Sequence, residues 1–407
     1  MREARPLGPG QLIVLALLGG IAPLGTDIYL PSIPAVATDL HAAVSTVQLT
    51  LTGFMAGLAL GPLLIGPVSD RFGRYRLLLV GILALLASSV LCALAPTVGV
   101  LIAARVVQGF CGSIALTLCR AMVADLATGA GAARIYSLLG TIMGLSPIVA
   151  PIIGGVIQQW AHWRISFWVL AGLCALLLVG ALTLLRETLP PELRQRGGLG
   201  MTARNAARVV RDPHFVTFAL ALCCTSGALF SYISASPFVV QGILGWEPLA
   251  YSAVFAVNAA GLTTAAGISA ATAGKLGPVR LVRVGSGAIL VGASALAVAA
   301  AVGIREPGVL LPAMFLIPTG AGFVFGNATA LATQTVRYAA GTAMAVIGFL
   351  QFGMSGLVAP LVSVAGPDSI TPFAAIALAA GILLAVFAAV GARVDARTRA
   401  ASPRGAS

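Results

Sequence analysis

The sequence predicts an all-α polytopic membrane protein of about twelve spanning helices. Of its 407 residues, 59% are hydrophobic and only 9% are charged, whereas soluble domains carry about 25% charged residues. Apolar runs long enough to cross a bilayer, which takes about 20 residues, recur along the whole chain. Lipid is therefore the expected solvent for much of the surface, and no room remains for a soluble catalytic domain.

The apolar runs are separated by short polar or Gly/Pro-containing breaks. The longest polar segment, 186–213, carries six arginines and divides the chain into an N-terminal six-helix bundle (1–185) and a C-terminal one (214–407) with a short tail. The predicted spans are 11–34, 47–66, 77–95, 99–124, 136–157, 165–185, 214–240, 249–273, 281–303, 308–334, 340–364 and 371–392.

The positive charges predict that both termini face the cytoplasm. In that orientation twenty of the 24 cations lie on the inside, only Arg164 and Arg305 lie outside, and Arg105 and Arg120 fall within the fourth span. Cytoplasmic loops are enriched in Lys and Arg, so the bias supports an even number of spans. We interpret the arginines as topology signals and anchors to the lipid bilayer, and not as a nucleic-acid surface.

Chemistry that needs a cofactor or metal has no recognisable motif here. The six cysteines lie in apolar stretches without a CxxC or zinc spacing, and the three histidines are scattered. A GxxxxGK[ST] phosphate loop is missing from the sequence. We therefore expect neither an enzyme nor an ATP-driven pump, and no bound cofactor.

Two short matches suggest that the halves are related. Tyr29–Pro34 resembles Tyr232–Pro237 at an offset of 203 residues, and Asp70–Gly73 resembles Gly274–Gly277 at an offset of 204. Transporters built from repeats commonly hold their substrate between the halves, near the membrane midplane. The candidates for the cavity lining are polar, aromatic or flexible residues within spans: Tyr29, Gln48, Met55, Tyr232, Asn258, Asn327 and Gln351.

The loop between the second and third spans reads GPVSDRFGRYR over residues 66–76. It is similar to the signature loop of the major facilitator superfamily, with Gly66, Asp70, Arg71, Gly73 and Arg74 as the residues that matter. Glycine permits close helix contact and tight turns, and Asp70 is expected to accept from Arg71 or Arg74 or to face a helix N-terminus. The resemblance implies a cytoplasmic latch between the halves. The alternative is an ordinary charged loop.

Two further stretches resemble signatures of the same superfamily. Arg105 lies inside the fourth span, where a charge is costly and usually faces a cavity or a counter-charge; the alternative is that it snorkels to the surface. The fifth span is similar to the proline–glycine signature of the antiporter branch, although Ala150 stands where that branch usually has glycine. Simple packing of small residues is the alternative. Its candidate residues are Pro147, Pro151, Gly154 and Gly155.

Asp27 is the one acidic residue that the predicted spans place inside the membrane. Such a carboxylate is a functional candidate by default, because burial favours its neutral form and a nearby cation favours its charged form. Asp27 and Arg105 have compatible depths, so we expect them to interact and to couple transport to protons. The alternative is that Asp27 only forms hydrogen bonds near a kink at Pro31 and Pro34.

Nearly the whole chain resembles the bicyclomycin/chloramphenicol resistance (Bcr/CflA-type) branch. The matching stretches are 27–31 (DIYLP), Trp163-Arg164, 187–190 (ETLP), 234–238 (SASPF) and 341–343 (GTA). The resemblance implies a monomeric antiporter in a bacterial cell membrane that exports amphipathic drugs against a proton gradient. Gly19 stands where some multidrug members carry a second acid. A symporter that imports a small metabolite on the same fold is the alternative function.

Overall fold

The computed structural model describes residues 8–126, 129–190, 192, 194, 198–366 and 368–401. Within these ranges the chain is almost wholly helical and has no strand. The first half comprises α1 (Pro9–Asp27), α2 (Ile33–Asp39), α3 (Val44–Phe72), α4 (Arg74–Ala93), α5 (Val98–Leu126), α6 (Gly129–Trp160) and α7 (Arg164–Leu184). After α8 (Gly198–Val209), the second half comprises α9 (Pro213–Pro237), α10 (Pro248–Leu276), α11 (Pro278–Val302), α12 (Pro307–Gln334), α13 (Ala340–Leu361) and α14 (Thr371–Ala401).

Eleven stretches of the described residues are long and apolar enough to cross a membrane. They account for every predicted span except 136–157. That span falls in α6, a helix of 32 residues, where the side chains of 129–139 and 141–143 lie outside the described part. The predicted all-α membrane fold is therefore confirmed.

The first span is broken near its end. α1 stops at Asp27, a single 3-10 turn covers Leu30–Ser32, and α2 continues from Ile33. Pro31 and Pro34 explain the break, because proline lacks the N–H that a helix needs and disfavours a helical conformation in the residue before it. The predicted kink is confirmed, and it leaves Asp27 at the end of a helix.

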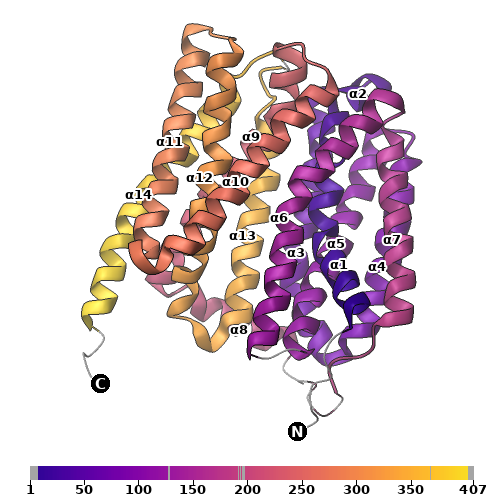
Figure 1. The fold of residues 1–407 in the computed structure, drawn as a ribbon, viewed down its shortest axis with the longest axis vertical. Helices are drawn as coiled ribbons and strands as arrows, with labels where there is room; N and C mark the ends of the chain where they lie inside the picture. The colour runs from indigo at the N-terminus through magenta and orange to yellow at the C-terminus, as the bar shows by residue number, and fades with distance from the viewer. Residues whose placement is uncertain are drawn as a thin grey trace.

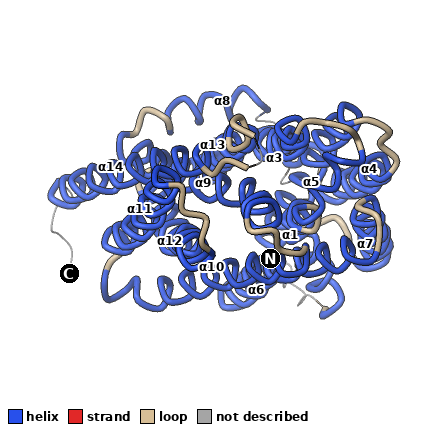
Figure 2. The backbone as a smooth tube through the Cα atoms, turned by 90° about the horizontal axis from the view of Figure 1, so that it is seen from above, coloured by secondary structure: helices blue, strands red, loops and turns tan. Residues whose placement is uncertain are grey.

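The helices form two groups that stand side by side (Figures 1 and 2). The groups meet where α3 packs against α13 and where α6 packs against α10. We call the end of the molecule that carries α8 and the start of α1 the α8 end, and the end that carries α2 the α2 end (Figure 1). Successive long helices run in alternate directions between these ends, so α3 and α5 both finish at the α8 end.

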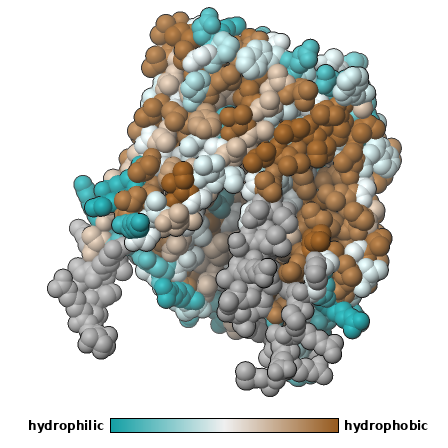
Figure 3. Space-filling view, viewed as in Figure 1, coloured by the Kyte–Doolittle hydropathy of each residue, from teal (hydrophilic) through white to brown (hydrophobic). Residues whose placement is uncertain are grey.

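The outer surface suits a lipid environment. Large apolar side chains such as Leu83, Leu176 and Val298 are more than half exposed. Figure 3 shows apolar residues over much of the middle of one face, with polar residues gathered towards both ends. A water-soluble protein rarely exposes apolar patches of this extent, and a bilayer covers them without cost.

The polar segment 186–213 contains a helix that the search for apolar runs does not predict. α8 contacts α3 and α13 at the α8 end, and its Ala206 and Val209 pack against the core of the second half. Its arginines at 204 and 208 are exposed. A helix of 12 residues that carries two arginines is too short and too polar to resemble a span.

A central cavity between the halves

A cavity of about 1180 Å³ lies between the two groups of helices. Its wall includes residues of α1, α3 and α5 from the first half and of α9, α12 and α13 from the second. At the α8 end its mouth is lined by Asp70 and Arg74 and by Met201, Thr202 and Asn205 of α8. The cavity is therefore reached from the α8 end.

Hydrogen bonds between the halves close the α2 end. The Gln48 amide in α3 donates to the Ser234 carbonyl of α9 at 3.0 Å, and the Ser363 hydroxyl beyond α13 donates to the Gln48 side-chain oxygen. The Gln241 amide donates to the Pro31 carbonyl at 3.2 Å. These partners are neutral, so the closure depends on hydrogen bonds that each contribute about 1 kcal/mol.

Asp27 lies on the wall of the cavity at the break in α1. Asp27 is 6% exposed, and the exposed part faces the cavity. None of the ion pairs in the described part of the chain includes it. The expected direct interaction between Asp27 and Arg105 is therefore wrong for this conformation.

Arg105 lies behind α1 and is fully buried. One guanidinium nitrogen, Nη1, donates to the Gly25 carbonyl at 2.9 Å and to Gln108 Oε1 at 2.7 Å. Its two other donor atoms, Nε and Nη2, have no hydrogen-bond partner. The alternative that Arg105 snorkels to the surface is wrong, because the side chain points into the first bundle and is tied to the backbone two residues before Asp27.

Aromatic rings surround the Arg105 cation. The guanidinium carbon lies 4.2 Å from the ring centre of Phe54 and 5.2 Å from that of Tyr29. Such contacts stabilise a cation that has lost its water by about 2 kcal/mol each. Close packing of α3 on α5 brings Phe54 there, since a side chain at Gly57 or Gly109 would collide with the backbone of the other helix.

The proline–glycine stretch lies in α6 between the two halves. A side chain at Gly154 would collide with the Ile28 carbonyl at the end of α1, and one at Gly155 would collide with Ser252 of α10 in the other half. Pro147 and Pro151 lie within the same helix. The packing of small residues is thus present, and its role in antiport stays a prediction.

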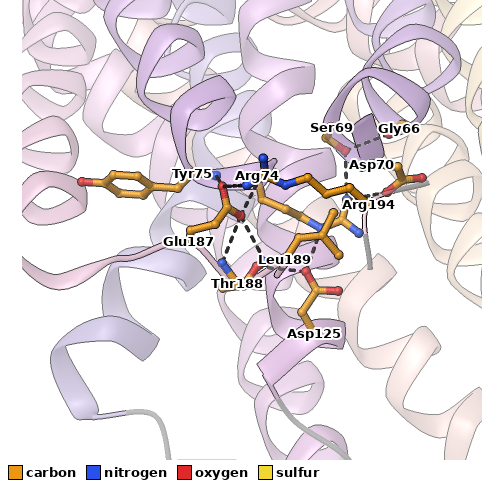
Figure 4. A network of polar contacts seen from close by, with 10 residues as sticks. All are labelled: Gly66, Ser69, Asp70, Arg74, Tyr75, Asp125, Glu187, Thr188, Leu189 and Arg194. Carbon is orange, nitrogen blue, oxygen red and sulfur yellow. Dashed lines mark hydrogen bonds and ion pairs between the residues drawn. The ribbon is translucent and has the colours of Figure 1, made fainter. Parts of the chain in front are cut away.

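The α3–α4 loop is held by a polar network (Figure 4). Arg74 pairs with Asp70 at 2.9 Å and with Asp125 of α5 at 2.7 Å, and it also donates to the Ser69 hydroxyl at 2.9 Å. Asp70 therefore accepts from Arg74, one of the two predicted donors. The other, Arg71, instead lies over the ring of Phe72 at 5.1 Å.

Glu187 fastens the start of α4 to the end of α7. Its carboxylate accepts from the backbone N–H groups of Arg74 at 2.9 Å and Tyr75 at 3.4 Å (Figure 4). Burial raises the pKa of Glu187, but the backbone donors of Arg74, Leu189 and Tyr75 and the Arg194 guanidinium outweigh it, so the pKa lies below its ordinary value. The network thus stabilises the ionised carboxylate.

The two glycines of this loop differ from each other. Gly73 has a φ of 95°, as the predicted tight turn requires. Gly66 has open space where a side chain would be, so the expectation that it allows close helix contact is wrong; it lies on the cavity wall. In the described residues, the ion pairs of Asp70 and Arg74 stay within the first half, so they make no contact between the halves here, and the latch stays a prediction.

Of the predicted lining residues, Met55 and Gln351 lie on the cavity wall. The other five are buried away from it, in contacts between helices. Tyr29 accepts from Thr50, Asn258 donates to the hydroxyl of Tyr232, Asn327 donates to Ser269, and Gln48 closes the α2 end. In an apolar bundle a polar side chain finds a partner on a neighbouring helix, which explains why polarity is a poor guide to this cavity.

Most of the wall consists of residues that the sequence does not distinguish. Leu58, Phe230 and Phe352 line the cavity together with Thr26, but apolar residues at neighbouring positions face lipid. Position on the helix could have found Leu58, which follows Met55 by three residues on the same face of α3.

Known proteins agree with this architecture. The family model of the Major Facilitator Superfamily matches residues 15–360. The structure of a mutant of the nucleoside transporter NupG superimposes with a TM-score of 0.74 over 94% of this chain and 98% of that one, at 14% identity. The chain therefore belongs to the major facilitator superfamily and is a membrane transporter, not an enzyme.

Two relatives have a higher identity to this chain. The chain is 36% identical over 366 residues to the uncharacterized MFS-type transporter YdgK of Bacillus subtilis (strain 168), covering 88% of this chain and 90% of the relative. It is 30% identical over 364 residues to a bicyclomycin resistance protein homolog of Haemophilus influenzae, covering 89% and 90%. The resemblance to the Bcr/CflA-type branch is thus confirmed.

Proposed function

We propose that this chain is a proton-coupled antiporter that exports small amphipathic molecules, of the bicyclomycin or chloramphenicol kind, through the central cavity. The observation that carries the proposal is Asp27, a carboxylate on the cavity wall at the break in α1. An ionised carboxylate within a membrane is costly. One that touches a water-accessible cavity can release its proton on one side and take up another after the cavity opens on the other.

Arg105 supports this proposal as a positioning residue. Its guanidinium holds the Gly25 carbonyl, two residues before Asp27, and it keeps two unpaired donor atoms. When Asp27 loses its proton, the new negative charge is attracted to this fixed cation. A shift of the α1 break towards Arg105 would therefore couple the protonation of Asp27 to the shape of the cavity.

The cavity also supports the proposed substrate class. Its volume exceeds the range of about 300–1,000 Å³ that is usual for small-molecule pockets, and Leu58, Phe230 and Phe352 give it apolar walls. Thr26, Asp27 and Gln351 supply a few polar groups among them. The same proposal places the monomeric chain in a bacterial cytoplasmic membrane with both termini inside, so that the α8 end opens to the cytoplasm.

Everted membrane vesicles test the function. With a preset pH gradient, acid inside, addition of chloramphenicol or bicyclomycin should release protons from the lumen through the wild-type chain. Asp27→Asn should abolish this release while leaving the amount of inserted protein unchanged, because an amide cannot carry the proton. Asp368→Asn, which changes an exposed carboxylate at the α2 end, is the matched control and should behave as wild type.

Two results would contradict the proposal. Wild-type drug-driven proton release by Asp27→Asn would remove that carboxylate from the mechanism. Loss of a preloaded metabolite from the vesicle lumen together with protons would show the symport direction instead.

A further inference from the structure

Helix α8, which connects the two halves in the sequence, has two faces with different surroundings. Met201, Thr202 and Asn205 of α8 line the mouth of the central cavity. Ala206 and Val209 on the adjoining positions pack against the protein core. One side of α8 is thus committed to the transporter, and the position of α8 sets the shape of the entrance.

The other side of α8 and the turn after it carry a basic stripe that consists of Arg204, Arg208 and Arg211. Arg204 and Arg208 are four residues apart on one face of α8, Arg211 lies in the turn that follows Val209, and all three are exposed. Ala203 and Ala207, also exposed, lie beside them and leave the guanidinium groups accessible. The stripe is therefore a surface with three positive charges close together.

The carboxylates in the described part of the chain form no ion pair with this stripe. Within the described residues, no ion pair includes Arg204, Arg208 or Arg211. The acids nearest in the network at this end have other partners, since Asp70 and Asp125 pair with Arg74. Arginine is well suited to phosphate recognition, so the stripe offers a site for an external phosphate group.

The stripe lies where the membrane surface is expected. α8 ends only a few residues before Pro213, the first residue of the spanning helix α9, whose N-terminus Asp212 caps. Seen from above, α8 runs lengthwise along the rim of the molecule beside α13 and α3 (Figure 2). Because α8 lies at one end of the molecule (Figure 1) and leads into a spanning helix, we expect its outward face at the level of the lipid headgroups.

We propose that the basic stripe of α8 binds the phosphate groups of anionic phospholipids, and that this contact holds α8 against the mouth of the central cavity. Arginine matches phosphate with paired hydrogen bonds, and each basic residue near an anionic membrane surface strengthens attachment by up to about fivefold. Val210, which directly follows α8 and is about half exposed, adds apolar contact with the acyl chains. The partner is thus a lipid surface.

A fluorescent probe on α8 tests the proposal without any substrate. Bimane is attached at Ala207→Cys in the full chain, with its six native cysteines replaced by alanine, and the protein is reconstituted in phosphatidylcholine vesicles. Brominated phosphatidylglycerol is compared with phosphatidylcholine that carries the same brominated chains. We expect phosphatidylglycerol to quench the probe with several-fold higher apparent affinity, and added salt to weaken the difference.

Two triple variants are compared, and each removes three positive charges from a different site. R204Q/R208Q/R211Q should make the two lipids quench equally. K275Q/R280Q/R283Q removes exposed cations at the same end but away from α8 and should keep the preference. Equal quenching in the chain with the native arginines, a salt-independent preference, or a preference lost only in the second triple variant would overturn the proposal.

Discussion

The α3–α4 loop of the first half and the α10–α11 loop of the second half have a similar backbone conformation but different side-chain contacts. Gly73 and Gly277 have φ angles of 95° and 80°, and each donates its N–H to the carbonyl four residues earlier. In the first half, Glu187 and Arg194 fill the space beside Gly73, whereas nothing lies within 4 Å of a side chain at Gly277. The repeat thus reproduces the turn, and the first half alone surrounds it with ion pairs in the described structure.

The membrane-spanning parts show the same contrast. α5 of the first half buries Arg105 beside the α1 break that carries Asp27. α12, the fourth spanning helix of the second half, has no cation between Pro307 and Gln334, and its buried amide Asn327 donates to Ser269 and to the Phe323 carbonyl. The fourth spanning helix of the second half therefore supplies a neutral amide where that of the first half buries a cation.

Among the variants that compare the two halves, substitution of Arg105 is expected to have the largest effect. Arg105→Lys keeps the charge, but an ammonium cannot reproduce the guanidinium's bonds to Gly25 and Gln108 together with its ring contacts. Loss of a charged hydrogen bond costs about 1.5–3 kcal/mol, so drug-driven proton release should fall about tenfold to a hundredfold. Asn327→Ala in the second half should change it far less. Equal losses of proton release in the two variants would refute the claim that Arg105 of the first half matters more than Asn327 of the second.

Substitution of Gly73 and of Gly277 should destabilise the protein to different extents. Alanine at either position meets a backbone conformation that costs about 1–3 kcal/mol for a residue with a side chain. At Gly73 the new methyl group also collides with the Glu187 carboxylate. Gly73→Ala should therefore lower the thermal unfolding temperature clearly more than Gly277→Ala. Equal shifts would show that the network around Gly73 moves aside without cost.

The hydrogen bonds of Gln48 connect the halves and can be tested separately. Gln48→Ala removes the bonds to Ser234 and Ser363, so the α2 end should open more often, by about fivefold for each bond of 1 kcal/mol. Spin labels at Thr97→Cys and Glu306→Cys, both exposed at that end, should report more long distances.

Thr38→Ala is the control for this measurement. It removes a bond within its own helix at the same end, to the Pro34 carbonyl, and should leave the distances unchanged. An unchanged distance distribution in Gln48→Ala would mean that other contacts close the α2 end.

The smallest expected effect is a pH dependence from Glu187. Because its folded pKa lies below 4.5, its stabilisation is present above that pH and is lost as the pH falls through the folded value. Glu187→Gln should lower the stability at neutral pH by about 1 kcal/mol, as loss of a helix cap does, and the difference from wild type should vanish on acidification. Glu192→Gln, an exposed acid, should show no such convergence.

The fold and the main charged residues could be predicted from particular stretches. Apolar runs of spanning length gave the helices, because lipid imposes that length. The prolines at 31 and 34 gave the break after Asp27. The cavity wall could not be predicted, because Leu58 and Phe352 are of the same residue types as apolar residues on the lipid face, while Gln48 and Asn258 found partners between helices.

By itself the sequence determined the membrane class, the order of the helices and the placement of Asp27 and Arg105 within the spans, since charge and hydropathy act locally along the chain. Only the tertiary structure decided that Arg105 holds the backbone of α1 rather than the carboxylate of Asp27, that the cavity opens at the α8 end, and that α8 lies across its mouth. These features depend on how helices distant in the sequence pack together, and the pattern of a single helix does not contain that information.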